Sequence, residues 1–131
     1  MKGLHTAVFV ACVLLDSMPA WPAFACDVPA TDRTYGYGPI NPIKVGGIDR
    51  GQGPANERRF LDALRGPQGQ PLSYVRRGSC CPFHSAHGLM GQGLLDVYAV
   101  TYEGLSQPVE LYLNMYEDGP AQVPVGFTCS R

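Results

Sequence analysis

Two alternating stretches joined by a short loop decide the fold of this chain: Leu95-Asp96-Val97-Tyr98-Ala99-Val100-Thr101-Tyr102-Glu103, then Gly104-Leu105-Ser106-Gln107-Pro108, then Val109-Glu110-Leu111-Tyr112-Leu113-Asn114-Met115-Tyr116. In the second stretch every other residue is aliphatic, which is typical of a strand with one apolar face. In the first stretch both alternating sets are largely apolar or aromatic, as expected of a central strand covered on both sides. We therefore expect an antiparallel hairpin over residues 95–116 at the centre of a sheet.

Weaker strand patterns lie on both sides of this hairpin. Residues 72–77 predict a strand, and residues 80–88 predict an irregular loop after it. Residues 43–45 and 123–127 are short and lie near prolines, which are tolerated at the edge of a sheet. The sum is an antiparallel sheet of three to five strands, most of it within residues 72–127.

One amphipathic helix is predicted over residues 55–65. Phe60, Leu61 and Leu64 fall on one face, the acidic Glu57 lies near the start, and Gly66-Pro67 ends the pattern. The preceding residues, 26–54, form an arm rich in glycine and proline, in which regular helix is improbable. A small sheet with one packed helix makes the expected fold class α+β.

The first 25 residues predict a cleavable secretion signal. An apolar run over residues 7–15 is too short to span a bilayer, and Ala23-Phe24-Ala25 places the cut before Cys26. Residues 26–131 would then form one domain, located in the periplasm or outside the cell. A cysteine directly after the cut is also what lipoprotein processing requires, so a lipid anchor on Cys26 is the alternative. We favour ordinary cleavage because ten residues, 16–25, separate the apolar run from the cut.

Four cysteines remain after cleavage, and an oxidising compartment favours two bridges among them: Cys26, Cys80, Cys81 and Cys129. Neighbouring residues of an extended chain point to opposite sides, so we expect Cys80 and Cys81 to pair separately with the distant Cys26 and Cys129. A single bridge from Cys26 to Cys129 is the second arrangement. Acylation of Cys26 would instead leave three cysteines.

Charge and motifs exclude several classes of function. The net charge is −1, which lacks the basic surface that binds nucleic acid. The chain has no phosphate-cradling loop, no serine nucleophile elbow and no metalloprotease helix. His84 and His87 lie near the adjacent Cys80 and Cys81, which raises a metal site or a cysteine nucleophile as alternatives, but we interpret them as surface histidines. We assign no catalytic residue, metal or cofactor.

A set of polar and aromatic residues is the candidate binding surface. Asp96 is placed to form an ion pair with Arg76 or Arg77 across the sheet. Tyr112 and Tyr116 share the face opposite the aliphatic stripe, where they would form a rigid contact surface unless the helix or the arm covers them. The candidate binding residues are Arg76, Arg77, His84, His87, Asp96, Tyr112 and Tyr116.

Several motifs resemble a family of small uncharacterised bacterial envelope proteins and lipoproteins, some of them labelled 2-dehydro-3-deoxyphosphooctonate aldolase. They are Gly38-Pro39-Ile40-Asn41-Pro42-Ile43-Lys44-Val45-Gly46-Gly47, Asn56-Glu57-Arg58-Arg59-Phe60-Leu61-Asp62-Ala63-Leu64, Arg77-Gly78-Ser79-Cys80-Cys81-Pro82-Phe83, Gly93-Leu94-Leu95-Asp96 and Leu111-Tyr112-Leu113-Asn114-Met115-Tyr116. The resemblance implies export and carries over no catalytic residue, because a barrel enzyme needs about 250 residues.

These observations predict an exported, noncatalytic binding module, similar in size and compartment to inhibitor or immunity proteins. It would bind another protein or a small envelope ligand through the tyrosine-bearing sheet face and residues 76–87. It would meet the membrane only through a lipid anchor on Cys26. The alternative function is a small envelope enzyme acting on a sugar or a phosphate ester, which would depend on Arg77 or Asp96.

Overall fold

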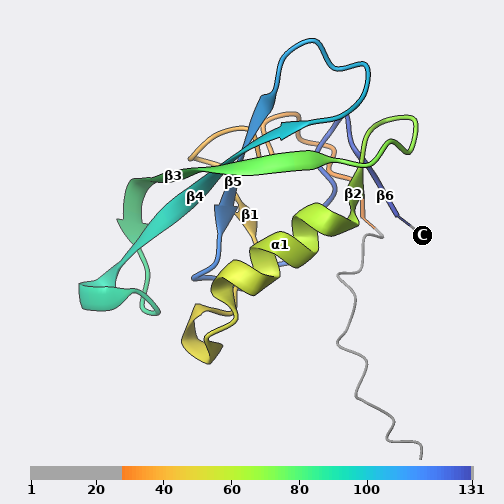
Figure 1. Cartoon of the computed structure of the whole chain (residues 1–131). Coiled ribbons are helices and arrows are strands. Elements are labelled where there is room, and N and C mark those ends of the chain that lie inside the picture. The colour runs from red at the N-terminus through yellow and green to blue at the C-terminus, as the bar shows by residue number, and fades with distance from the viewer. Residues whose placement is uncertain (1–27, 131) are drawn as a thin grey trace, which may run out of the picture.

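The computed structural model describes residues 28–130 (Figure 1). The predicted signal segment, 1–25, and Cys26 lie outside the described residues. The described elements, in chain order, are β1 (Ile43–Lys44), the 3-10 helix η1 (Ile48–Arg50), α1 (Gly53–Ala63), β2 (Leu64–Arg65), β3 (Ser73–His84), the 3-10 helix η2 (Leu89–Gly91), β4 (Gln92–Thr101), β5 (Val109–Asn114) and β6 (Thr128–Cys129).

A four-stranded sheet in the order β1-β5-β4-β3 forms the main layer, and it confirms the α+β class. The predicted hairpin is β4 and β5, which pair antiparallel from Asp96↔Leu113 to Val100↔Val109. β1 is the edge strand expected near residue 43, but it pairs with β5 in parallel, so the sheet is mixed rather than wholly antiparallel. The parallel pairing arises because the arm runs alongside β5 before the chain enters α1.

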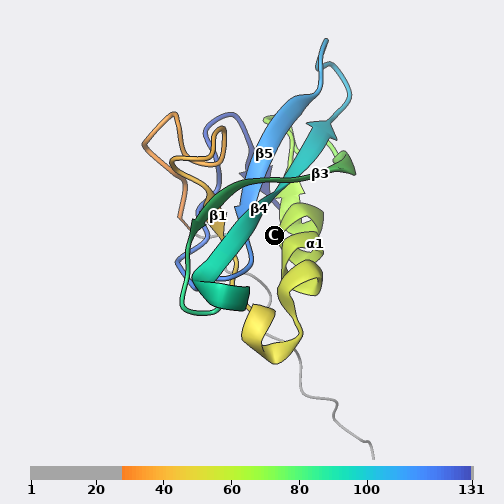
Figure 2. The same ribbon diagram turned by 90° about the vertical axis from the view of Figure 1, so that its left-hand side faces the viewer.

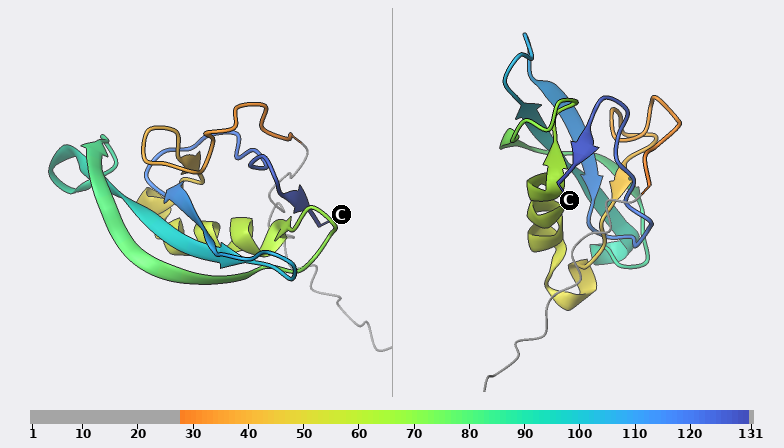
Figure 3. Two further views of the ribbon diagram at one scale, coloured as in Figure 1. Left: turned by 90° about the horizontal axis from the view of Figure 1, so that it is seen from above. Right: turned by 90° about the vertical axis from the view of Figure 1, so that its right-hand side faces the viewer.

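The sheet curves around α1, which packs against one of its faces (Figures 2 and 3). α1 begins at Gly53, two residues before the predicted start, and ends at Ala63, where the chain enters β2. Phe60, Leu61 and Leu64 are buried as predicted. Together with the apolar sides of β4 and β5 they form the core, whose other members are Ala30, Tyr35, Ile43, Val45, Tyr98, Val100, Leu111, Leu113, Val123 and Phe127.

The end of the chain forms a second, two-stranded sheet rather than the edge strand predicted at 123–127. Val123 makes only an isolated parallel bridge to Pro29. The last strand is β6, which pairs antiparallel with β2 through Leu64↔Cys129. Pro124 removes a backbone donor from the predicted strand, which explains why regular pairing resumes only at Thr128. Among residues 28–130, no helix has the length and apolar character needed to cross a membrane.

The prediction of a loop over residues 80–88 is wrong for its first half, because β3 continues to His84. β3 pairs with β4 from Ser73↔Thr101 to His84↔Gln92 and is an edge strand of the sheet formed by residues 28–130. Its register shifts twice, once between Arg76 and Gly78 and once between Cys80 and Phe83. These bulges accommodate glycine and proline within a strand and let it bend. The far end of the β3–β4 hairpin projects from one end of the molecule (Figure 1).

The disulfide pairing expected from the sequence is also wrong. Cys80 and Cys81 are bonded to each other, and neither reaches a distant cysteine. Cys81 lies in the second bulge with φ +64°, which breaks the alternation of the strand and brings the two side chains to one side. Cys129 also takes part in a disulfide. Its expected partner, Cys26, lies outside the described residues, as does the site proposed for lipid attachment.

Candidate functional site

A polar network lies where the face of the sheet that carries α1 meets the edge strand β3. The Arg76 guanidinium donates two hydrogen bonds to Asp96, from Nε at 3.1 Å and from Nη2 at 3.0 Å. Ser79 lies opposite Asp96 in the β3–β4 register and donates to the same carboxylate at 2.8 Å. The Asp96 side chain is 4% exposed, whereas that of Arg76 is 50% exposed. The network therefore connects a buried carboxylate to the surface.

Glu57, on α1, extends the network into the core. Its side chain is completely buried, and the Tyr98 hydroxyl donates to its Oε2 at 2.9 Å. Oε1 has no hydrogen-bond partner within the described part of the chain. It nevertheless lies close enough to Asp96 for the pKa of each carboxyl group to depend on the other. Two acidic groups thus share one buried region between α1 and β4.

The two carboxyl groups differ in protonation. Burial, with the nearby Asp96 charge, raises the pKa of Glu57 from 4.5 to about 8, so Glu57 is mostly neutral at pH 7. Burial acts in the same direction on Asp96, but the hydrogen bonds from Arg76 and Ser79, together with the Arg76 charge, outweigh it and lower the pKa of Asp96. One proton therefore lies on Glu57, and Asp96 carries the negative charge that Arg76 neutralises. Burial also raises the pKa of Tyr98, which stays neutral.

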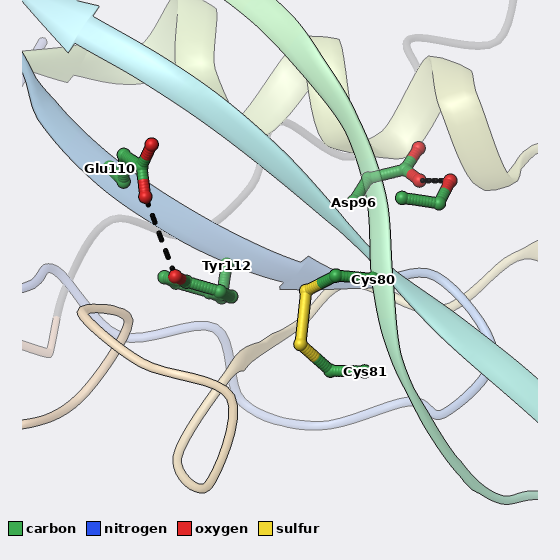
Figure 4. The surroundings of a disulfide bond; sticks show 6 residues. Cys80, Cys81, Asp96, Glu110 and Tyr112 are labelled. Carbon is green, nitrogen blue, oxygen red and sulfur yellow. Dashed lines mark hydrogen bonds between the residues drawn. A yellow bond between two sulfur atoms is a disulfide. The ribbon is translucent and has the colours of Figure 1, made fainter.

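The opposite face of the sheet carries the Cys80–Cys81 bridge and Tyr112 (Figure 4). Tyr112 lies opposite Val97 in the β4–β5 register, and Cys80 lies opposite Leu95 in the β3–β4 register. Directly opposed residues share a face, so these side chains adjoin one another. Leu95 and Val97 are buried although they lie outside the main core cluster. The disulfide and Tyr112 thus cover a small second apolar layer.

An aromatic pair extends this face toward the end of the hairpin. The Phe83 and Tyr116 rings meet edge to face, with centroids 5.8 Å apart. They cover Gly93, which is paired with Phe83, and a Cβ at that position would lie 2.7 Å from the Phe83 ring. Tyr116 is therefore half-buried against a neighbour rather than free, and Tyr112 is half-buried too. The tyrosines cover the sheet and are also accessible at its surface.

The far end of the hairpin, residues 84–91, presents two large apolar side chains to solvent. Leu89 is 88% exposed and Met90 is 94% exposed. Met90 has φ +55°, a conformation that costs a non-glycine residue free energy. Behind this tip, His87 Nδ1 lies 3.7 Å from a carboxylate oxygen of Asp49 on η1. The contact connects the hairpin to the segment that leads into α1.

The structure therefore brings together only some of the residues predicted to form a site. Arg76 and Asp96 pair on one face, Tyr112 lies on the other, and His87 lies near the tip. Arg77 and His84 are exposed and belong to none of these groups. Sequence reasoning missed Glu57 as a buried acid, Ser79 as a network member and the exposed pair Leu89 and Met90. An apolar pair inside a glycine-rich turn was the signal available for the last of these.

Two cavities are lined by residues of the arm. The larger has a volume of about 460 Å³ and is lined by Arg33, Thr34 and Tyr37 with residues 38–41. The smaller, of about 330 Å³, lies on the other side of Asn41, toward Lys44 and Gln122.

No group of three or more histidine, cysteine, aspartate or glutamate side chains within residues 28–130 is arranged to hold a metal ion. No protein-family model, curated protein or solved structure matches this chain.

Proposed function

We propose that this chain is exported and acts outside the cytoplasm as a noncatalytic module that binds another protein through the tip of the β3–β4 hairpin. The observation that carries the proposal is the exposure of Leu89 and Met90, at 88% and 94%. Neighbouring large apolar side chains at the end of a projecting hairpin are suited to enter an apolar pocket of a partner, and methionine is enriched at protein interfaces. The proposed anchors, Leu89 and Met90, lie just beyond the binding region expected at residues 76–87.

Two further features support a protein partner. The strained backbone at Met90 holds its side chain outward, and strain of this kind gathers at binding loops and other functional positions. Aromatic side chains continue from the tip along one face of the sheet: the pair Phe83 and Tyr116, and the half-buried Tyr112. Aromatic side chains are enriched at protein interfaces because each combines a large contact area with a polar tip or edge.

Crosslinking from two matched positions tests the binding site. A photoreactive residue replaces Met90 in one variant and Ile40 in the other, since Ile40 is 98% exposed in the arm. We expect one stoichiometric partner in the native envelope to be captured from position 90 and not from position 40. An excess of unlabelled protein should suppress the capture, whereas a Leu89→Ser/Met90→Ser double variant should not. Equal capture from both positions, or equal competition by the double variant, would contradict the proposal.

Export is tested on the native N-terminus by mass spectrometry. Cleavage by a general signal peptidase gives a chain that begins at Cys26, and a diacylglyceryl adduct there identifies the anchored form. Recovery from the cytosol with Met1 still present would refute export in either form.

The alternative, a small envelope enzyme acting on a sugar or a phosphate ester, has one observation in its favour. Glu57 is neutral and Asp96 ionised near neutral pH, the pairing that general acid and general base catalysis requires. Glu57 is completely buried, however, and the neighbouring Asp96 nearly so, which leaves substrate little access to either. Hydrolysis of a sugar or phosphate ester that survives purification and is lost in Asp96→Asn would favour the enzyme over the binding module.

A further inference from the structure

The Cys80–Cys81 bridge lies at a position that is accessible to a thiolate in solution. Both residues are half-buried, on the side of the sheet away from α1 (Figure 4). They belong to β3, the edge strand of the main sheet as described, so no further strand from residues 28–130 pairs with β3 on that side. Exchange of a disulfide requires an incoming thiolate to approach one of its sulfur atoms. The edge position of β3 allows that approach without unfolding of the core.

The backbone that carries the bridge is strained. Cys81 has φ +64° and precedes Pro82, and a residue before proline strongly prefers extended backbone. Cys81 and Pro82 together oppose only Leu94 in the β3–β4 register, so the strain is confined to one bulge. The eight-membered ring of the bridge holds the two side chains together in this conformation. Breaking the ring frees Cys81 to return to extended backbone, and the strain relieved favours the dithiol form.

The other disulfide described lies in a different setting. Cys129 is disulfide-bonded within β6, which pairs with β2 at the end of α1. It packs against the main core cluster, and the following Ser130 donates its backbone N–H to the carbonyl of Ala63 at 2.8 Å. Its backbone φ is not among those that are positive at a non-glycine residue. Cys129 thus lies in regular, packed structure, whereas the Cys80–Cys81 bridge lies in a strained edge bulge.

From this contrast we infer that Cys80–Cys81 is a thiol–disulfide exchange site, reactive toward a dithiol, while the Cys129 bridge is structural. A thiolate of the dithiol attacks one sulfur of the pair, the S–S bond breaks, and the other cysteine leaves as a thiolate that takes up a proton. The second thiol of the reductant then attacks the mixed disulfide. The products are two cysteine thiols in the protein and one disulfide in the reductant, a transfer of two electrons and two protons.

Reduction then changes the hairpin. Once Cys81 leaves the positive φ region, the bulge between Cys80 and Phe83 no longer fixes the path of the strand toward His84. The contact between His87 and Asp49, and with it the position of the hairpin tip, depends on that path. The redox state of Cys80 and Cys81 therefore determines how well ordered residues 78–94 are, and it leaves α1 unaffected. This inference does not depend on what the tip binds.

The test uses the folded protein and graded dithiothreitol, followed by alkylation and peptide mapping. Cleavage after glutamate separates Cys80 and Cys81, in the fragment 58–103, from Cys129, in the fragment 118–131, whereas trypsin leaves them together because no lysine or arginine lies between Arg77 and Arg131. We expect the adjacent pair to be alkylated at a reductant concentration roughly tenfold below the one that frees Cys129. Release of all three cysteines together, or of Cys129 first, would overturn the inference.

Hydrogen exchange supplies the second readout. Reduction of the pair should speed amide exchange in residues 78–94 at least severalfold, and exchange in α1 should stay constant. A Cys80→Ser/Cys81→Ser variant should match the reduced protein and should not respond to dithiothreitol in this segment. A variant that instead exchanges like the oxidised wild type would show that the ring does not hold the bulge. Because the alkylation experiment needs no variant, it decides the exchange chemistry even if the double variant fails to fold.

Discussion

Replacing Glu57 by glutamine should remove most of the loss of stability that we expect between pH 5 and pH 8. In the folded protein the pKa of Glu57 is raised from 4.5 to about 8, chiefly by burial and then by the Asp96 charge. Between these two values the folded state binds one proton more than the unfolded state. The free energy of unfolding therefore falls as the pH rises, by about 1.4 kcal/mol per pH unit.

The loss, summed over that range, reaches about 5 kcal/mol, a large share of the stability of a small domain. Glutamine cannot ionise, so the Glu57→Gln variant does not undergo this pH-dependent loss of stability. Its amide oxygen can accept the Tyr98 hydroxyl, and its amide nitrogen can take the place of the protonated oxygen beside Asp96. At pH 5, where Glu57 is neutral, the variant and the wild type should differ by less than about 1 kcal/mol. Above pH 8 the variant should be the more stable by several kcal/mol.

Urea denaturation followed by circular dichroism, from pH 5 to pH 9, measures the difference directly. The difference between variant and wild type isolates the titration of Glu57, because Asp96 stays ionised across this pH range and groups far from Glu57 contribute equally to both proteins. Glu103→Gln serves as the control, since Glu103 is exposed on the loop after β4. Its profile should run parallel to that of the wild type. If Glu57→Gln also ran parallel to the wild type, the buried neutral acid would be refuted, and with it the asymmetry between Glu57 and Asp96.

Other substitutions test the remaining parts of the structure by denaturation and thermal melting. Asp96→Asn should cost about 2 kcal/mol at pH 7 because it removes a charged hydrogen-bond acceptor, whereas Arg77→Gln should stay within about 0.5 kcal/mol. The pKa of Asp96 is lowered, so its contribution should disappear as the pH falls through that pKa, and the difference between Asp96→Asn and the wild type should shrink in acid. Gly93→Ala should cost about 1–3 kcal/mol, since an aromatic ring lies 2.7 Å from the new Cβ; Gly38→Ala, with no atom within 4 Å, should be nearly neutral. Asn56→Ala should cost about 2–3 kcal/mol, because the Asn56 amide donates at 3.1 Å to two carbonyls of the chain after β1, which would lose that donor; equal stability would contradict this role.

The sequence predicts a strand or helix correctly where the spacing of its apolar residues matches the residues that the core buries. Strict alternation over residues 109–116 predicts β5, and the spacing of Phe60 and Leu61 predicts the buried face of α1. Both predictions are correct because each pattern marks the apolar side chains that become buried on folding. The same rule failed for the second half of β3. This part of the strand contains residues that favour a break, namely Gly78, the two cysteines and Pro82. Two bulges accommodate them, so β3 keeps its pairing with β4.

The candidate site was harder to predict because it depends on contacts distant in sequence. In the sequence, Glu57 is expected to interact favourably with the helix dipole because it lies near the start of a helix. Its burial, and therefore its neutral state, result from the packing of α1 on β4. Extended backbone at Cys81 would keep its side chain away from that of Cys80, but the positive φ of Cys81 brings the two side chains together and allows the adjacent disulfide. The ion pair of Asp96 agrees with the sequence-based expectation. Arg76 lies opposite Tyr98, on the side of β4 that also carries Asp96, and the bulge after Arg76 brings Ser79 opposite Asp96.

The parallel pairing of β1 with β5 has a consequence for how the chain folds. Ile43 aligns with Leu113, Pro29 bridges to Val123, and the Tyr37 hydroxyl donates to the Val125 carbonyl. Contacts of such wide sequence separation give a high contact order, which slows folding because large loops must close before the contacts form. The β3–β4–β5 meander can assemble early from local pairings. The arm can dock only after β5 and the residues beyond it are available, so this step should limit the rate at which the core closes.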